Sequence, residues 1–413
     1  MVTENTLESE IKSWLDIILE KENLKNLSVQ ISGKTEKGDG YIGDVVFARA
    51  AGTAENESTK EYDLVLKCSK SSQALREDRR FIDTFINEMY IYDKILPLFI
   101  QFQHDRGISE VFKNIPKSYG TLALENREVV VLENLKSIGY ELWPRQKPLT
   151  RKHIDLVMQA YGKYHATSIA FKQQEPEKYQ EIVNTLRENL KSFAKSGPGL
   201  TTMKKCVEDA YEILKNDLDE STLLKWKSLG DNIQSVLEEI RNAEAMNVIL
   251  HGDCWSNNFM YKYEDEDKSI PTEVVILDWQ LARPAVLICD LSYFLFCCIS
   301  ENDIHNMEDV LNVYYKHFSE HLAEFGIDSN VLYPLNQLMD DWKKYCKYGI
   351  MFASMLLRIT AIGKEDVVDV AEAVEMGKDF GESFVNEMKD NDKLIFKSRI
   401  QYIVEYVVKH GLI

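Results

Sequence analysis

Two apolar stretches that each end in acidic or amide side chains constrain this chain more than any other feature. Residues 248–258 read VILHGDCWSNN, and residues 274–280 read VVILDWQ. Each begins with a run of Val, Ile and Leu that predicts a short buried strand. Each then reaches its polar residues where a strand would give way to a loop, and the sequence between them predicts a hairpin arm and its turn. We therefore expect a small β-structure to bring Asp253, Asn258 and Asp278 together.

The spacing of these polar residues matches the requirements of phosphoryl transfer. Asp253 and Asn258 are five residues apart, as are Asp and Asn in the kinase pattern H-R-D-L-x-x-x-N. One carboxylate orients the attacking hydroxyl and accepts its proton, while an amide and a second carboxylate hold metal ions on the phosphates. Asp and Asn are also common in ordinary turns. The second strand ending in Asp278, followed by DLSYFL from Asp290, favours the phosphoryl-transfer interpretation.

Composition excludes several other classes of protein. The 413 residues suffice for two domains or one bilobal unit. A net charge of -18 disfavours nucleic acid and anionic membranes as partners, because both require a basic surface. We find no apolar run of the ~20 residues that a membrane span needs, and no secretory signal. Seven scattered cysteines without metal-ligand spacing are typical of reduced thiols, so we expect a cytoplasmic protein.

A glycine-rich segment lies between two predicted strands near the N-terminus. Residues 27–31 alternate between apolar and polar, and a strand pattern resumes at 45–51. A strand, a glycine-rich turn and a returning strand can place backbone N–H groups over phosphates. Gly38, Gly40 and Gly43 are the candidates for that role. The alternative is an ordinary turn, since most glycine-rich hairpins are no more than that.

A lysine and a glutamate are predicted to pair beside this segment. Lys67 stands near the end of an apolar strand, where a lysine commonly snorkels to the surface. In the next helix, however, Phe81, Phe85, Glu88 and Tyr92 recur at helical spacing, so Glu88 shares a face with three aromatic rings. A carboxylate on such a face is costly unless it is paired. Lys67 is its natural partner, as a strand lysine pairs with a helix glutamate in kinases.

The remainder of the chain completes a predicted bilobal organisation. Two more strands, 118–124 and 128–132, give a five-stranded antiparallel sheet with one helix. The segment at Glu133 and Leu135 then leaves the sheet, as a generic linker or as a hinge whose backbone binds adenine. We expect three parts: an N-terminal lobe at 1–132, a hinge and linker at 133–149, and a helical lobe at 150–413 that contains the catalytic segment 248–290.

Helical periodicity dominates the second half of the chain. It predicts helices at residues 223–243, 304–325 and 332–360, and two more toward the C-terminus. His165 lies on an apolar helix face and is interpreted as a core histidine rather than a ligand. The aromatic residues around Trp342 are interpreted as packing, with a substrate pocket as the alternative.

Together these motifs resemble the ecdysteroid kinase-like family, within the choline kinase and aminoglycoside phosphotransferase group of protein kinase-like folds. The resemblance lies in His251-Gly-Asp253 with Asn258, in ILDWQ around Asp278, and in DLSYF from Asp290. It runs from the glycine-rich hairpin to the helical C-terminal lobe. It implies an α+β bilobal fold and the use of ATP and Mg²⁺. It also implies that Asp290 braces the catalytic loop and that His251 and Gly252 shape it.

The same resemblance assigns a role to each polar candidate. Asp253 would be the catalytic base, and Asn258 and Asp278 would be the magnesium ligands. Lys67 and Glu88 would anchor the nucleotide phosphates.

The resemblance also assigns the backbone contacts to the nucleotide. Gly38, Gly40 and Gly43 fit the kinase spacing G-x-G-x-x-G, and Glu133 and Leu135 would stand at the adenine hinge.

The predicted acceptor is a small molecule. Only eleven residues separate Asp278 from Asp290 and no Ala-Pro-Glu follows, so the chain lacks the activation segment that docks a peptide in protein kinases. The resemblance implies a hydroxyl of a lipophilic alcohol, such as an ecdysteroid or another sterol. A choline-type acceptor would need an aromatic cage, for which Trp255, Trp279, Trp342 and nearby tyrosines are candidates. The remaining alternatives are an aminoglycoside-type kinase and a catalytically silent kinase fold that binds a ligand. No obligate protein partner is evident.

Overall fold

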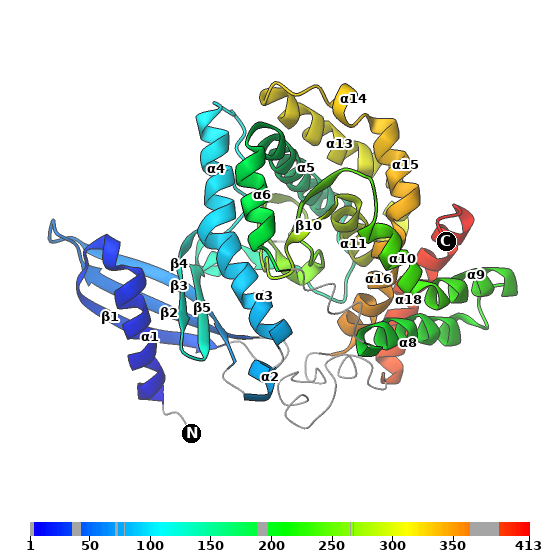
Figure 1. The fold of residues 1–413 in the computed structure, drawn as a ribbon. Helices are drawn as coiled ribbons and strands as arrows, with labels where there is room; N and C mark the ends of the chain where they lie inside the picture. Colours follow the sequence, from blue (N-terminus) through cyan, green and yellow to red (C-terminus); the bar gives the residue numbers. More distant parts are fainter. Residues whose placement is uncertain are drawn as a thin grey trace.

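The chain forms a sheet lobe and a larger helical lobe that lie side by side (Figure 1). The computed structural model describes residues 4–34, 43–70, 73–77, 79–187, 197–264, 266, 268–363 and 388–413. All seven cysteines are free and buried. Within the described ranges, no helix combines the length and the apolar character that crossing a bilayer would require.

Five antiparallel strands form the sheet lobe in the order β1-β2-β3-β5-β4. Their bounds are β1 Lys25–Lys34, β2 Gly43–Thr53, β3 Thr59–Ser69, β4 Ser118–Leu124 and β5 Arg127–Glu133. The predicted five-stranded antiparallel sheet is therefore confirmed. Helix α1, Glu4–Ile18, continues into the 3-10 turn η1, Glu20–Glu22, and its apolar stripe packs against one face of the sheet.

The two faces of the sheet have different surroundings, because successive side chains on a strand point to opposite sides. Leu64 and Leu66 of β3 are buried against α1. Val45, Val65 and Lys67 alternate with these buried positions and are only partly buried. One face of the sheet is therefore covered by a helix, and the other faces a pocket.

A long helical segment connects the sheet lobe to the helical lobe. After α2, Gln73–Glu77, it runs without interruption through α3, Arg79–Tyr90, the π-helical turn η2, Ile91–Ile95, and α4, Leu96–Asp105. Phe99 and Phe102 of α4 pack on Phe171, deep in the core of the helical lobe.

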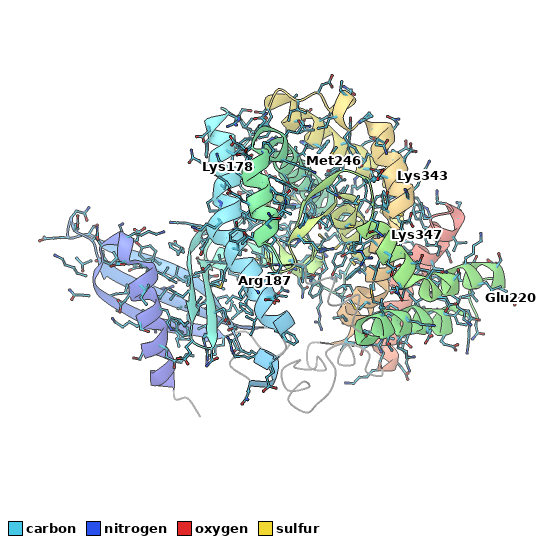
Figure 2. The ribbon with its side chains drawn as sticks, viewed as in Figure 1. Lys178, Arg187, Glu220, Met246, Lys343 and Lys347 are labelled. Carbon is cyan, nitrogen blue, oxygen red and sulfur yellow. The ribbon has the colours of Figure 1, made fainter. Side chains whose placement is uncertain are left out.

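A second contact also ties α3 to the helical lobe. The side-chain amide of Asn87 donates to the carbonyl of Arg187 at 2.9 Å and accepts its N–H at 2.8 Å. Arg187 follows α6 and is labelled in Figure 2. The helix that carries Glu88 is thus fixed to the helical lobe at both Asn87 and α4.

Two small sheets belong to the helical lobe. In one, the strands β6, Glu141–Leu142, β8, Phe259–Tyr263, and β9, Pro271–Ile276, pair in the order β6-β8-β9. In the other, β7, Asn247–Leu250, pairs with β10, Arg283–Val286. The hinge itself contains the 3-10 turn η3, Leu135–Ile138, and a second turn, η4, covers Ser256–Asn258.

The helical lobe consists mainly of helices around one large apolar core. Its helices are α5 Arg151–Gln174, α6 Pro176–Thr185, α8 Gly197–Leu214, α9 Glu220–Asp231, α10 Ile233–Arg241, α11 Ile288–Cys298, α12 Glu301–Ile304, α13 Met307–Glu324, α14 Ser329–Leu332, α15 Leu335–Tyr345, α16 Lys347–Ala361 and α18 Asp390–Lys409.

Two of the predicted long helices are divided, so those predictions were wrong in extent. Residues 223–243 split at Asn232, whose side chain donates to the Ser228 carbonyl at 2.8 Å and competes with the helical backbone. Residues 332–360 split at Pro334, which has no N–H to donate, and again at Cys346, where a ψ of -14° tightens the turn. Of the two helices predicted toward the C-terminus, α18 is present, and the other prediction falls outside the described residues.

Candidate active site

The catalytic segment leaves β7 through a turn that only glycine can make. Gly252 has a φ of +88°, and a Cβ there would lie 2.3 Å from the Leu281 carbonyl oxygen and 2.8 Å from an Arg283 nitrogen. Both the backbone conformation and the available space therefore exclude a side chain.

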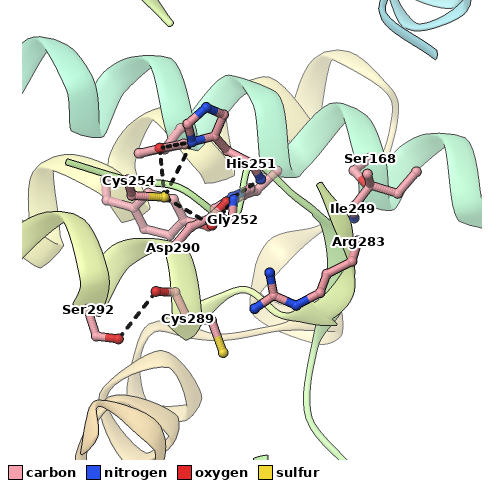
Figure 3. A network of polar contacts seen from close by, with 12 residues as sticks. Ser168, Ile249, His251, Gly252, Cys254, Arg283, Cys289, Asp290 and Ser292 are labelled. Carbon is pink, nitrogen blue, oxygen red and sulfur yellow. Dashed lines mark hydrogen bonds and ion pairs between the residues drawn. The ribbon is translucent and has the colours of Figure 1, made fainter. Parts of the chain in front are cut away.

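Asp290 holds this turn from the next helix, as Figure 3 shows. Its carboxylate accepts the N–H of His251 at 2.7 Å and the N–H of Gly252 at 2.9 Å, and the thiol of Cys254 at 3.1 Å. Burial opposes the charged form, but the hydrogen bond and charge of His165 hold the pKa of Asp290 below its ordinary value. The predicted brace is confirmed, and His165 is the core histidine that was expected.

Asp253 points its carboxylate toward two hydrogen-bond donors. The amide nitrogen of Asn258 lies 2.9 Å from Oδ2 and also 2.9 Å from the Asp253 carbonyl oxygen, while the Tyr293 hydroxyl lies 3.1 Å from Oδ1. Burial, followed by the nearby charge of Asp278, raises the pKa of Asp253. The predicted proximity of Asp253, Asn258 and Asp278 is confirmed.

Asp278 follows β9 in a left-handed backbone conformation, with a φ of +61°. That conformation costs about 1–2 kcal/mol for a residue with a side chain, although Asp tolerates it better than most. The residue at this corner places its carboxylate on the pocket, where Oδ1 lies 2.7 Å from Lys67 Nζ.

Lys67 is held between two carboxylates. Its Nζ lies 2.7 Å from Glu88 Oε2 as well as 2.7 Å from Asp278 Oδ1, and the Glu88 side chain is 1% exposed. Burial opposes the charge of Lys67, yet Asp278 and Glu88 raise its pKa above the ordinary value. Burial also raises the pKa of Glu88. The predicted pairing of Lys67 with Glu88 is confirmed as geometry, and its role in phosphate binding stays a prediction.

These polar groups border a pocket of about 240 Å³ between the two lobes. Its polar lining includes Lys67, Glu88, Asp253, Asn257, Asn258, Asp278 and Gln280. Its apolar lining includes Val45, Phe47 and Val65 from the sheet, Leu132 beside the hinge, and Met260 and Leu277 from the helical lobe. Apolar residues from both lobes and the carboxylates therefore line one pocket beside the hinge.

The hinge lies at the apolar end of this pocket. Glu133, Asn134 and Leu135 all border it. The N–H of Glu133 is bonded to the Lys117 carbonyl, and the N–H of Asn134 to the Asp63 carbonyl, each at 2.9 Å. Leu135 is the first residue of η3, a position whose N–H has no acceptor within the helix. Of these three hinge residues, Leu135 is therefore the one whose N–H the described backbone leaves open for another acceptor.

Of the three candidate glycines, only Gly43 belongs to the described residues; Gly38 and Gly40 lie outside them. Gly43 begins β2 and borders the pocket. A Cβ there would lie 2.6 Å from the Phe85 ring and 2.8 Å from the Cys68 carbonyl oxygen. Glycine is needed at this position because α3 packs directly against the strand.

Several lining residues were missed by the sequence analysis. On the neighbouring strands β2 and β3, Val45 pairs with Lys67 and Phe47 pairs with Val65. The alternation of these residues with buried ones along each strand could have predicted that they share the face of Lys67. Tyr293 was quoted in a motif but assigned no role, because nothing in the sequence shows that its hydroxyl reaches Asp253.

The three tryptophans proposed for an aromatic cage do not meet. Trp255 borders the pocket. Trp279 is fully buried against Tyr164, with ring centroids 4.9 Å apart, and Trp342 stacks on Phe296 at 5.7 Å. Two of the three are therefore used in core packing.

Comparison with known proteins identifies the family. A model of the ecdysteroid kinase-like family matches residues 37–327, which is more than half of the chain. The chain belongs to the ecdysteroid kinase-like family. The expected protein kinase-like fold is the one observed, with an antiparallel sheet lobe joined by a hinge to a helical lobe. A search of curated protein sequences finds no match.

Several solved structures are similar to this family member. A GDP complex of aminoglycoside 2′-phosphotransferase-IIIa has a TM-score of 0.44 at 13% identity, covering 98% of each chain. The choline kinase LicA from Streptococcus pneumoniae has a TM-score of 0.37 at 13% identity, covering 97% of this chain and 99% of that one. A glucosamine kinase in complex with glucosamine, ADP and inorganic phosphate has a TM-score of 0.30 at 10% identity, covering all of both chains. Such low values do not indicate which acceptor this chain uses.

Proposed function

We propose that this protein transfers the γ-phosphoryl group of ATP to a hydroxyl of a small, lipophilic acceptor such as an ecdysteroid or another sterol-like alcohol. The observation that carries the proposal is that Lys67, Glu88, Asp253, Asn258 and Asp278 all border one pocket beside the hinge. These are the groups that phosphoryl transfer uses to anchor phosphates, hold metal ions and position a nucleophile.

The pocket has a suitable place for each part of ATP. The adenine would lie between Val45 and Val65 on one side and Met260 and Leu277 on the other, with the N–H of Leu135 as its expected donor. The phosphates then extend toward the opposite end of the pocket, where the positive charge of Lys67 attracts them.

The donor set at the phosphate end fits Mg²⁺. The amide nitrogen of Asn258 is bonded to Asp253, so its amide oxygen is the atom left for a metal, and the Asp278 carboxylate borders the same space. Both are hard oxygen ligands. Among the described residues no group of three or more His, Cys, Asp or Glu side chains could hold a metal alone, which agrees with the preference of Mg²⁺ for one or two protein ligands plus phosphates. When bound, Mg²⁺ would neutralise charge on the phosphate oxygens.

Asp253 is the group suited to the acceptor hydroxyl. It lies 9% exposed at the pocket, and Tyr293 and Asn258 fix the direction of its carboxylate. It would orient the attacking hydroxyl and take its proton.

The proposed acceptor is small because the chain leaves no platform for a peptide. From Asp278 the backbone passes through the short strand β10 directly into α11, where a protein kinase would have an activation segment. A choline-type acceptor is disfavoured, because Trp279 and Trp342 are engaged in the core and do not form a cage.

Radiolabelled ATP and Mg²⁺, offered with an ecdysteroid, cholesterol, choline, glucosamine and an aminoglycoside, test the proposal directly. We expect transfer to the ecdysteroid or the sterol and little or none to choline. Transfer to choline or the aminoglycoside alone would correct the acceptor class. A chain that shows no transfer and no ATP hydrolysis, but gains thermal stability from a ligand, would instead be a silent binder.

Two variants separate the roles of the carboxylates. Asp253→Asn should keep thermal stabilisation by ATP with Mg²⁺ while turnover falls ~10²–10⁴-fold, the usual worth of a positioned base. The loss would be smaller if the transition state is loose. Asp278→Asn should lose the Mg²⁺-dependent part of that stabilisation together with turnover. The reverse pattern would show that the two roles are exchanged.

A further inference from the structure

Among the described residues, the hydroxyl of Tyr293 is the one hydrogen-bond donor to Asp253 that lies outside the catalytic segment. Asn258, which binds the other carboxylate oxygen, lies only five residues further along the chain. Tyr293 instead belongs to α11 and lies 3.1 Å from Oδ1 of Asp253. Helix α11 begins directly after β10, and its Asp290 already holds the backbone of the same segment.

Tyr293 has little freedom to move. It is 2% exposed, and its ring packs on Phe352 with centroids 4.8 Å apart and on Tyr348 at 6.4 Å. Both aromatic residues belong to α16. The hydroxyl is therefore held at the carboxylate by rings that are themselves part of a helix–helix contact.

The crossing of α11 and α16 fixes the backbone beneath this ring. At the crossing, a Cβ on Gly349 would lie 2.1 Å from the carbonyl carbon of Ser292, and the N–H of Gly349 donates to Ser292 Oγ at 3.2 Å. Such close contact fixes the position of the Ser292 backbone, directly before Tyr293. Asp290 and Tyr293 are one turn apart on α11, so one rigid helix positions both the backbone and the side chain of the catalytic segment.

We propose that Tyr293 is a positioning residue for phosphoryl transfer, which fixes the Asp253 carboxylate through its hydroxyl so that the remaining lone pairs meet the acceptor. With Oδ1 bound by Tyr293 and Oδ2 by Asn258, the carboxylate cannot rotate about its Cβ–Cγ bond. This inference rests on the proposed function, because Asp253 must act on an acceptor for its orientation to affect the rate.

The test is Tyr293→Phe, which removes one oxygen atom and keeps the ring packing. The assay uses ATP, Mg²⁺ and the alcohol of highest turnover in the acceptor panel, and transfer to water is the baseline. We expect kcat to fall ~10–100-fold, which is the worth of one hydrogen bond to a charged group. The KM for ATP should change by less than about 2-fold, because the lost contact does not touch the nucleotide.

A double variant tells orientation of Asp253 apart from general support of the fold. In an Asp253→Ala background, Tyr293→Phe should change kcat by less than about 2-fold, because the group it positions is gone. The matched control is Tyr333→Phe, since the buried Tyr333 hydroxyl donates to Asp341 at 2.8 Å, away from the pocket. This control should keep wild-type kcat. Thermal stabilisation by ATP with Mg²⁺ should be the same in all the tyrosine variants that retain Asp253.

The outcomes are distinct for the two hypotheses. A wild-type protein without ATP turnover rejects the proposed function, and the inference with it. An active wild type with an unchanged kcat in Tyr293→Phe rejects the inference alone. An equal fall of kcat in both backgrounds also rejects it, because the effect would then not pass through Asp253.

Discussion

At the scale of single residues, the position of Lys67 between two carboxylates gives it a part in stability as well as in ATP use. Glu88 is 1% exposed and Lys67 is its ion-pair partner. Removing one partner of a buried ion pair costs far more than removing both, because an unpaired charge is left in a poorly solvated place. Losing either Lys67 or Glu88 alone should therefore lower the free energy of unfolding.

Lys67→Met should lower the free energy of unfolding by about 3 kcal/mol as well as abolish turnover. The loss of unfolding free energy should grow as pH rises through the pKa of Glu88, which burial already raises. Only the ionised form of Glu88 is destabilised by the absence of Lys67. Urea unfolding at several pH values measures this. In the double variant Lys67→Met/Glu88→Gln much of the stability should return without activity. If the double variant is no more stable than Lys67→Met, an unpaired charge on Glu88 is not the cause of the lost stability.

At the scale of secondary-structure elements, the contact between α11 and α16 depends on one glycine. A Cβ on Gly349 would lie 2.1–2.5 Å from backbone atoms of Ser292 and Tyr293, so any side chain must push the two helices apart. Gly326 is a contrasting position: it has a φ of +77° and no atom within 4 Å of a Cβ.

Gly349→Ala should cost about 3 kcal/mol of stability or more, at or beyond the upper end of overpacking penalties. The control Gly326→Ala should cost about 1 kcal/mol, from backbone strain alone. Unfolding in urea gives both values. Equal losses would mean that α16 yields easily, and that the helix crossing does not fix the Ser292 backbone.

The elements also show what a single sequence can and cannot reveal. The strands, the catalytic segment and the Lys67–Glu88 pair follow from local patterns, since apolar alternation and motif spacing are read along the chain. The approach of Tyr293 to Asp253 and the bond between Asn87 and Arg187 join residues 40 and 100 positions apart. No local period encodes such contacts, because they depend on how helices cross.

At the scale of the whole molecule, buried neutral histidines make stability depend on pH. Burial lowers the pKa of His153 to about 4, and its ring contacts Thr150 and Tyr263, so it joins the start of α5 to the hairpin arm. His321 has a pKa lowered to about 4 by burial as well. In the unfolded chain these groups bind a proton near pH 6.5.

These two histidines should therefore contribute stability that is complete above pH 6.5 and is lost between pH 6.5 and 4, because the unfolded state takes up protons that the folded state does not bind. His153→Gln should show a shallower fall over this interval, whatever its effect at pH 7. The midpoint of urea unfolding, measured at intervals of half a pH unit for both proteins, tests this prediction. The exposed His104→Gln serves as the control and should retain the wild-type slope. An unaltered slope in His153→Gln would show that His153 is protonated in the folded protein.

The attachment of α3 has a consequence for how the two halves of the molecule move. This helix is continuous with α4, whose phenylalanines pack on Phe171, and it is bonded at Asn87 to Arg187. Glu88 is therefore attached to the lobe that carries Asp278, whereas Lys67 lies on a strand of the sheet. If the sheet rotates about the hinge, as the lobes of two-lobed enzymes commonly do, the distance from Lys67 to Glu88 should change while α3 keeps its contacts with the helical lobe. The ion pair between Lys67 and Glu88 would then be intact at some angles between the sheet and the helical lobe and broken at others.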